Sequence, residues 1–445
     1  MVDISVIDSS AQILTGGKKD YDALLELIGD ARFVLLGEAS HGTQEFYHER
    51  ALITQRLISE KGFSAVAIEG DWPDAYRVNR FICKQSADRT ADEALAGFER
   101  FPTWMWRNTE VMKFVDWLRD FNDTRIQPLH KVGFYGLDLY SLFTSIDEVI
   151  QYLDRVDPLA ARKARSDYAC FDHFERNSQL YGYVLSMYGA SHSCEDGVVA
   201  QLLELYKQAE KYLQHDGADA TDALFYAQQN ARLIKNAEQY YRNMFNHKIS
   251  SWNMRDRHMA EILESLDQHL SAKQNSPAKI VVWAHNSHLG DARATQMGEQ
   301  GELNVGQLMR EAHGNEAVLV GFTTHHGHVT AASDWGAPAE RKKIKPALHS
   351  SYEDYFHQTG ISSFYLPIRG NYLLQETLSF EQHLERAIGV IYLPQTERQS
   401  HYFYADLTKQ FDAIIHIDET HALKPLELTS HWVGGEAPET YPVGL

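Results

Sequence analysis

The predicted fold follows from one segment, Phe33-Val-Leu-Leu-Gly-Glu-Ala-Ser-His-Gly-Thr43. Its short apolar run, which stops at Gly37, predicts a strand buried on both faces. Residues 43–59 follow with apolar side chains at helical spacing. Residues 64–70 (Ser-Ala-Val-Ala-Ile-Glu-Gly) form a second apolar run of strand length. A strand, a helix and a strand in this order favour parallel pairing of the two strands.

Further along the chain, predicted strands precede and follow one long segment that is predicted to be helical. Residues 132–138 predict a third strand, whereas residues 141–270 contain no convincing strand and place Leu, Ala, Gln, Glu, Lys and Tyr at helical spacing. Later strands are predicted at residues 279–285, 317–322, 329–331, 363–366, 388–392 and 413–417. The sequence therefore predicts an α/β fold with a mostly parallel central sheet flanked by helices, and an inserted all-helical lobe covering the active-site edge.

The same pattern predicts the domain boundaries. Residues 1–140 and 271–432 are expected to form the two halves of the α/β catalytic core, and residues 141–270 the helical lobe. Residues 433–445 contain three Gly and two Pro and are expected to form an extended C-terminal tail.

Charge and composition argue against several classes of partner. The 445 residues carry a formal net charge of -19 at pH 7, whereas nucleic acids and anionic membrane surfaces attract proteins rich in Lys and Arg. No apolar stretch is long enough to span a membrane, and no signal peptide is recognisable. The three cysteines, Cys83, Cys170 and Cys194, suggest a reducing compartment and no disulfide framework. We therefore expect a cytoplasmic protein without a nucleic-acid or membrane partner.

Acidic and histidine side chains stand where the predicted strands end. They are Glu38 and His41 after the first strand, Glu69 at the end of the second, Asp138 at the end of the third, and His285 and His288 at the end of the strand at 279–285. Because the carboxyl ends of parallel strands share one edge of a sheet, where ligands bind, we expect these side chains to lie in one cleft. Clustered titratable groups of this kind are typical of catalytic sites.

His41 is the candidate general base. It lies directly before a predicted helix, whose N-terminal partial positive charge disfavours an imidazolium and keeps the ring neutral near pH 7. Glu69 or Glu38 is expected to orient the ring or to hold the attacking water. Arg50, about two turns into the same helix, is expected to hold a glutamate or a substrate carbonyl oxygen if it points inward.

Three alternatives stay open on the residues alone. Ser40 is a weaker nucleophile candidate, because the G-x-S-x-G spacing is missing. A non-catalytic protein that binds an apolar ligand is a second alternative. A metal-dependent hydrolase is the third: no cofactor is certain, but a divalent metal such as zinc or manganese accepts the ligand types present. The candidate ligands are Glu38, His41, Glu69, His285 and His288.

Two further groups of residues stand out. Trp72 and Trp106 are candidates for an apolar substrate pocket, although packing in the core explains them equally well. Ser40, Asp138 and Arg255 complete the predicted substrate-binding set. Residues 325, 326 and 328 are histidines that suggest a metal, but a loop at a strand end is the simpler interpretation.

Several segments carry a resemblance to a known family. Residues 37–43 (Gly-Glu-Ala-Ser-His-Gly-Thr), 67–73 (Ala-Ile-Glu-Gly-Asp-Trp-Pro) and 283–288 (Trp-Ala-His-Asn-Ser-His) resemble the signature segments of the erythromycin-esterase-like family. The resemblance extends to residues 101–107, 251–257 and 397–402, in the family's order. It implies an α/β core with a helical lobe, and a small-molecule ester or lactone as substrate, as in the antibiotic-resistance members that hydrolyse the macrolactone of erythromycin-type compounds.

The resemblance also implies roles for single residues. His41 matches the proposed general base of the family. The other matching positions are Glu38, Arg50, Glu69, His285 and His288. The sequence therefore predicts a hydrolase in which His41 takes a proton from the water that attacks an ester or lactone.

Overall fold

The computed structural model describes residues 2–125, 131–188, 193–215, 220–245, 248–379 and 381–434. The chain forms two compact units. The first unit consists of Met1–Ala67, Arg77–Phe134 and Pro277–Leu445, and the second of Ile68–Tyr76 and Tyr135–Ser276. Most of the predicted tail at 433–445 lies outside the described residues.

The central sheet has eight strands in the order β1-β9-β12-β6-β2-β5-β3-β4. Their bounds are β1 (Gln12–Ile13), β2 (Phe33–Leu36), β3 (Ala65–Asp71), β4 (Gly133–Asp138), β5 (Ile280–Trp283), β6 (Ala317–Thr323), β9 (Ser363–Pro367) and β12 (Ala413–Ile417). β2 pairs parallel with β5 and with β6, and β12 pairs parallel with β6. β9 runs antiparallel to both β12 and β1. The predicted α/β fold with a mostly parallel central sheet is confirmed.

The interior strands are buried along their whole length. Every residue of β2, β5 and β6 is buried, and Phe33 in β2 pairs with Ile280 on one side and with Ala317 on the other. Strands covered by helices on both faces need apolar side chains on both faces. This is why these strands read as continuous apolar runs rather than as alternating patterns.

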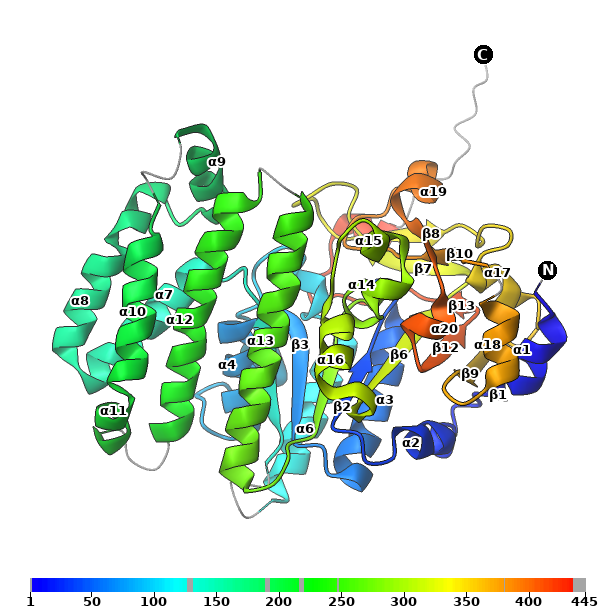
Figure 1. The fold of residues 1–445 in the computed structure, drawn as a ribbon, viewed down its shortest axis with the longest axis horizontal. Coiled ribbons are helices and arrows are strands. Elements are labelled where there is room, and N and C mark those ends of the chain that lie inside the picture. Colours follow the sequence, from blue (N-terminus) through cyan, green and yellow to red (C-terminus); the bar gives the residue numbers. More distant parts are fainter. Residues whose placement is uncertain are drawn as a thin grey trace. The chain divides into compact units, whose positions relative to one another are not determined.

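Helices flank the sheet in the first unit (Figure 1). They are α1 (Ile4–Ser10), α2 (Asp22–Ile28), α3 (Gln44–Lys61), α5 (Ala91–Leu95), α6 (Thr109–Asp123), α14 (Asn286–Leu289), α15 (Gln296–Glu299), α16 (Val305–His313), α17 (Tyr352–His357), α18 (Tyr372–Leu378), α19 (Glu397–Ser400), α20 (Leu407–Gln410) and α21 (Ser430–Gly434). Phe46, Ile53 and Leu57 of α3 are buried. That helix ends at Gly62, whose φ of 73° suits a glycine at a helix C-terminus.

Two small sheets complete the first unit. β7 (His326–Ala331) lies between β13 (Glu419–Thr420) and β8 (Glu340–Ile344), and β10 (His383–Arg386) pairs antiparallel with β11 (Tyr402–Ala405). The strand predicted at 388–392 is wrong, because that segment makes only isolated bridges at Ile388 and Ile391. Ile388 and Tyr392 instead pack in a core cluster with residues of β7 and β8. A short buried apolar run has the same sequence pattern whether or not its backbone joins a sheet.

The second unit is built from helices. They are α7 (Leu142–Val156), α8 (Pro158–Tyr168), α9 (Ser178–Tyr188), α10 (Glu195–Lys207), α11 (Ala209–His215), α12 (Ala220–Asn243) and α13 (Lys248–Gln274), while α4 (Trp72–Ile82) begins in this unit and ends in the first. α12 packs against α7, α10 and α13 (Figure 1). Among the described residues of 141–270 no strand occurs, as predicted.

Two further expectations concern disulfide bonds and membrane-spanning helices. Cys170 and Cys194 form a disulfide with a Cα–Cα distance of 5.8 Å, whereas Cys83 is free. The expectation that the chain has no disulfide is therefore wrong for this pair, because the number and spacing of cysteines in the sequence do not show which thiols meet in space. In the described parts of the chain, no helix has both the length and the apolar character needed to cross a membrane.

Candidate active site

The carboxyl ends of four neighbouring parallel strands carry the candidate groups of the first unit. Glu38 and His41 follow β2, and His285 and His288 follow β5. The adjacent strands β6 and β12 are followed by further histidine and aspartate side chains. Since β2, β5, β6 and β12 are parallel neighbours, these loops lie at one edge of the sheet.

Glycines allow the loops at this edge to pack closely. A Cβ atom on Gly37 would lie 2.1 Å from Oδ1 of Asn286, and one on Gly42 would lie 1.8 Å from the backbone oxygen of Thr330. Asn286 donates through its backbone N–H to the carbonyl of Glu38 at 2.8 Å, and its side chain donates to the carbonyl of Phe322 at 2.8 Å. The loops after β2 and β5 are therefore fixed to each other and to β6.

Glu38 connects two of the predicted site residues. Its Oε1 accepts from Nδ1 of His41 at 2.9 Å, and its Oε2 accepts from Nη2 of Arg50 at 2.7 Å. Glu38 and Arg50 are fully buried, and His41 is 7% exposed. Arg50 holds a glutamate, which is the first of the two roles expected from the sequence.

Aromatic rings surround the Arg50 guanidinium. Its Cζ lies 4.4 Å from the ring centre of Tyr47 and 5.1 Å from that of Trp283. The hydroxyl of Tyr47 donates to the backbone carbonyl of His41 at 3.0 Å. Helix α3, which begins at Gln44, therefore positions His41 through both its arginine and its tyrosine.

His285 lies beside His41, with ring centroids 4.8 Å apart. Nδ1 of His285 accepts the backbone N–H of Ser287 at 3.2 Å, at the start of α14. An imidazole that accepts through Nδ1 carries its proton on Nε2, so His285 can donate a hydrogen bond through that atom. His288 is buried in the last turn of α14.

The side chain of Ser40 is buried and hydrogen-bonded. Its hydroxyl is hydrogen-bonded to the hydroxyl of Thr43, and the residue is 1% exposed. Trp106, also predicted to bind substrate, is buried against Tyr47 and Phe98 with ring centroids 6.3 and 6.2 Å away. The roles of Ser40 and Trp106 in binding a substrate stay predictions.

Three predicted residues meet in the second unit. Nη2 of Arg255 lies 2.7 Å from Oε1 of Glu69 and 2.7 Å from Oδ2 of Asp138, and its Nε donates to Oδ1 of Asp138 at 3.0 Å. Both carboxylates are buried. Burial alone would lower the pKa of Arg255, but Asp138, Tyr140 and Glu69 raise it well above its usual value. The sequence predicted that Glu69, Asp138 and Arg255 belong to a site, but it did not predict that the arginine forms ion pairs with both carboxylates.

Trp72 belongs to the same unit. Its ring is stacked on Tyr135 and on Tyr226, with interplanar angles of 22° in both pairs. Trp72 is 1% exposed. The role of Trp72, Asp138 and Arg255 in binding a substrate stays a prediction.

A third cluster lies after β6 and β12 in the first unit. Within the described chain, His325, His326 and Asp418 offer ligand atoms that all lie within 4.8 Å of one another. Burial and the neighbouring His357 lower the pKa of His325 to about 4. Burial raises the pKa of Asp418, but hydrogen bonds with His416 and His357 outweigh it and lower the value to about 2. The sequence singled out the histidines but gave no signal for the aspartate, which is distant in the chain.

The comparisons with known proteins agree with this architecture. An erythromycin esterase family model matches residues 58–420. Erythromycin esterase type II of Escherichia coli is 23% identical over 432 residues, which cover 90% of this chain and 92% of that protein. The putative hydrolase YbfO of Bacillus subtilis (strain 168) is 23% identical over 348 residues, covering 74% of this chain and 71% of that protein.

Two solved structures share the fold. A succinoglycan biosynthesis protein superimposes with a TM-score of 0.77 at 21% identity, covering 95% of this chain and 97% of its own. A mutant of the erythromycin esterase EreC in its open conformation superimposes with a TM-score of 0.65 at 18% identity, covering 92% and 95%. At these identities the structural likeness establishes the fold alone, whereas the family model spans most of the sequence. The chain belongs to the erythromycin esterase family.

Proposed function

We propose that this protein hydrolyses a carboxylic ester or lactone with a water molecule activated by His41. The observation that carries the proposal is the buried chain Arg50–Glu38–His41, with contacts of 2.7 and 2.9 Å. A carboxylate that accepts from Nδ1 keeps the imidazole in the tautomer whose Nε2 lone pair can take a proton. Family membership supports the same reaction class.

The proton movements follow from this arrangement. Nε2 of His41 removes a proton from water as the oxygen attacks the carbonyl carbon. Glu38 then stabilises the imidazolium, and Arg50 holds Glu38 in place through their ion pair. Collapse of the tetrahedral intermediate breaks the ester C–O bond, and His41 returns the proton to the departing alkoxide. The products are an alcohol and a carboxylic acid, which releases the second proton of the water to become a carboxylate; both groups stay in one molecule if the substrate is a lactone.

His285 supplies a donor for the developing negative charge. Its proton lies on Nε2, because Nδ1 accepts from the backbone of Ser287. The ring is adjacent to that of His41. A preorganised donor of this kind contributes about 3–4 kcal/mol to transition-state stabilisation in other acyl-transfer enzymes.

The substrate class is a small ester or lactone, of which an erythromycin-type macrolide is the first example to test. A panel of macrolides, aryl esters and simple lactones is incubated with the protein, and the addition of one water is measured by mass spectrometry. The variant His41→Asn is expected to lose activity by about 10²–10⁴-fold. Ser40→Ala is expected to retain it.

The opposite outcome would favour a serine nucleophile. Full activity in His41→Asn together with loss in Ser40→Ala would overturn the proposed role of His41. Binding of a macrolide without ring opening, by a protein that also leaves every other panel member intact, would favour a non-catalytic binding protein.

A further inference from the structure

The turns that follow β6 and β12 bring a second group of polar side chains together. β12 pairs parallel with β6, and His416 lies opposite Thr323 at the end of the pairing. His325 lies two residues after the end of β6 and His326 begins β7, whereas Asp418 comes directly after β12. Parallel pairing therefore places an aspartate next to two consecutive histidines.

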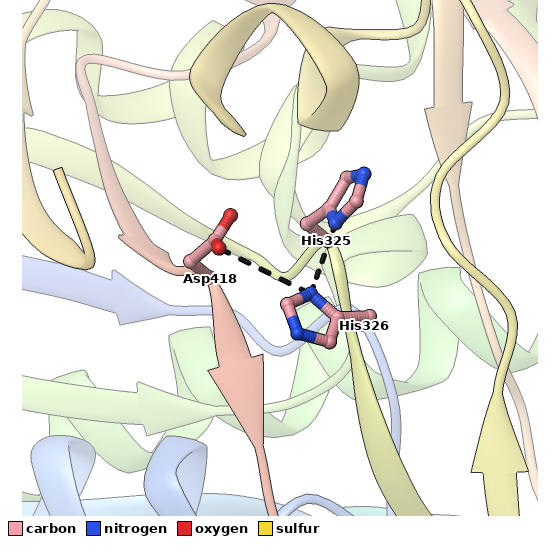
Figure 2. Close-up of side chains that lie close together, drawn as sticks. All are labelled: His325, His326 and Asp418. Carbon is pink, nitrogen blue, oxygen red and sulfur yellow. Dashed lines mark hydrogen bonds and ion pairs between the residues drawn. The ribbon is translucent and has the colours of Figure 1, made fainter. Parts of the chain in front are cut away.

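The three side chains converge in the way metal ligands do. Nδ1 of His325 lies 3.0 Å from Nδ1 of His326, which lies 4.0 Å from Oδ2 of Asp418 (Figure 2). Ligand nitrogens about 2.1 Å from a zinc ion are about 3.4 Å apart across a tetrahedral site. Small side-chain movements therefore suffice for all three atoms to contact one ion.

We propose that His325, His326 and Asp418 bind a divalent transition-metal ion. Two imidazole nitrogens and one carboxylate oxygen suit Zn²⁺, Co²⁺ or Ni²⁺ better than Mg²⁺ or Ca²⁺, which prefer oxygen ligands. Three protein ligands leave a coordination position for water. The site shares no residue with the buried chain Arg50–Glu38–His41 and does not depend on the proposed esterase activity.

The backbone holds the ligands in place before an ion arrives. The N–H groups of His325 and His326 donate to the carbonyl of Asp418 at 3.2 and 3.0 Å. His326 also pairs with Glu419 in the parallel bridge between β7 and β13. Little conformational freedom is left to lose when the ion binds, which favours affinity.

Two other histidines orient the aspartate. Nδ1 of His357 lies 2.8 Å from Oδ1 of Asp418, and Nε2 of His416 lies 3.4 Å from the same oxygen. The His357 ring also stacks on His325, with centroids 3.8 Å apart. Residues that hold ligands in this way are typical of metal sites, where they fix the direction of the ligating atom. His357 is therefore a positioning residue.

A bound ion would connect two sheets. β6 and β12 belong to the central sheet, whereas β7 and β13, which follow them, belong to the three-stranded sheet. An ion that binds the folded protein better than the unfolded chain raises the unfolding temperature with increasing metal concentration. The metal should therefore stabilise this protein even if it takes no part in catalysis.

The test uses the full-length protein, freed of metal by a chelator and then titrated with Zn²⁺ and with Co²⁺. Calorimetry and elemental analysis are expected to show one ion per chain, with a Co²⁺ absorption spectrum of nitrogen and oxygen ligands. His326→Ala and Asp418→Asn are expected to abolish binding. His357→Ala is expected to weaken it by about 10- to 100-fold.

His328→Ala is the matched control, because His328 is an exposed histidine of the same strand. It is expected to bind like the wild type. Absence of binding to the wild type, unchanged binding in His326→Ala and Asp418→Asn, or loss of the ion in His41→Asn would each overturn the proposal. Loss in His41→Asn would place the metal at the other cluster.

A labelling measurement on the wild type covers the case in which a variant fails to fold. Diethyl pyrocarbonate modifies accessible imidazoles, and mass spectrometry reports each site. Zn²⁺ is expected to protect His326, whose side chain is 35% exposed, and to leave His328 reactive. Equal labelling of His326 with and without Zn²⁺ would contradict the assignment.

Discussion

Glu38 accepts a hydrogen bond from Nδ1 of His41 at 2.9 Å. An ionised carboxylate can only accept, so this contact places the imidazole proton on Nδ1 and leaves Nε2 as the basic atom. Arg50 holds the other oxygen of the same carboxylate at 2.7 Å. The orientation of the His41 ring is thus set by Glu38 and, through Glu38, by Arg50. Either residue can be substituted while His41 is kept.

Glu38→Gln tests the orientation of the base. The amide is nearly isosteric, but it no longer stabilises an imidazolium and can stabilise the wrong tautomer. We expect kcat to fall by about 10²–10⁴-fold with little change in KM, because the loss affects the transition state. Steady-state kinetics on an ester found in the panel provides the measurement. Glu45→Gln, which changes a glutamate in the first turn of α3, is the control, and an unchanged kcat in Glu38→Gln would contradict the proposed pairing.

Arg50→Met tests the buried ion pair. Arg50 and Glu38 have side chains 0% and 1% exposed, so the variant leaves a buried carboxylate without its cation. We expect a loss of about 3–5 kcal/mol in the free energy of unfolding, measured with urea. Arg56→Met on the same helix removes the more exposed pairs with Glu60 and Asp22 and should cost less than about 1–2 kcal/mol for the two pairs together.

A double variant isolates the coupling. Glu38→Gln combined with Arg50→Met removes both charges and should be less destabilised than the sum of the single changes. Strict additivity would show that the two residues do not interact in solution.

Gly42→Ala tests the close approach of the loop after β2 to β7. The new Cβ would lie 1.8 Å from the backbone oxygen of Thr330, which cannot rotate away. Overpacking of this kind costs about 1–3 kcal/mol and shifts the backbone that carries His41. Gly389→Ala is the control, since nothing lies within 4 Å of its Cβ position. Thermal unfolding and ester hydrolysis should both be impaired in Gly42→Ala, and equal melting temperatures in the two variants would refute the clash.

His258 makes the stability of the second unit sensitive to acid. Burial lowers the pKa of His258 to about 3, from an ordinary value of 6.5. Below pH 6.5 the unfolded chain therefore binds a proton that the folded protein does not. The free energy of unfolding should fall by about 1.4 kcal/mol per pH unit from this residue, until the pH approaches 3. Above pH 6.5 the residue makes no pH-dependent contribution.

The contribution is measured as a difference between two proteins. His258→Gln preserves an acceptor for the side chain of Asn236, which lies 2.9 Å from Nδ1 of His258. Urea unfolding at pH 7, 5.5 and 4.5 should show a shallower loss of stability in this variant than in the wild type. Identical slopes would mean that His258 is protonated in the folded state.

The buried strands were predictable because burial on both faces requires a continuous run of apolar residues, which is visible in a short stretch of sequence. β2, β5 and β6 are covered on both faces, so every position is apolar and the run is visible without any knowledge of the fold. Polar residues directly after such runs were predicted to share a sheet edge, and in the first unit Glu38, His41 and His285 lie close together. The segment 388–392 shows where this prediction fails, since a buried segment that does not pair as a strand has the same apolar sequence pattern.

The sequence by itself determined the α/β class, the parallel order of strand and helix, and the residues at the strand ends, because these depend on apolar periodicity within short windows. Only the tertiary structure decided the partners: Glu38 with His41 and Arg50, Glu69 with Asp138 and Arg255, and His325 with His326 and Asp418. The members of the last two groups lie up to 186 positions apart. Their contacts arise from strand pairing and side-chain packing, and no local pattern in the chain encodes the distance between two atoms so far apart.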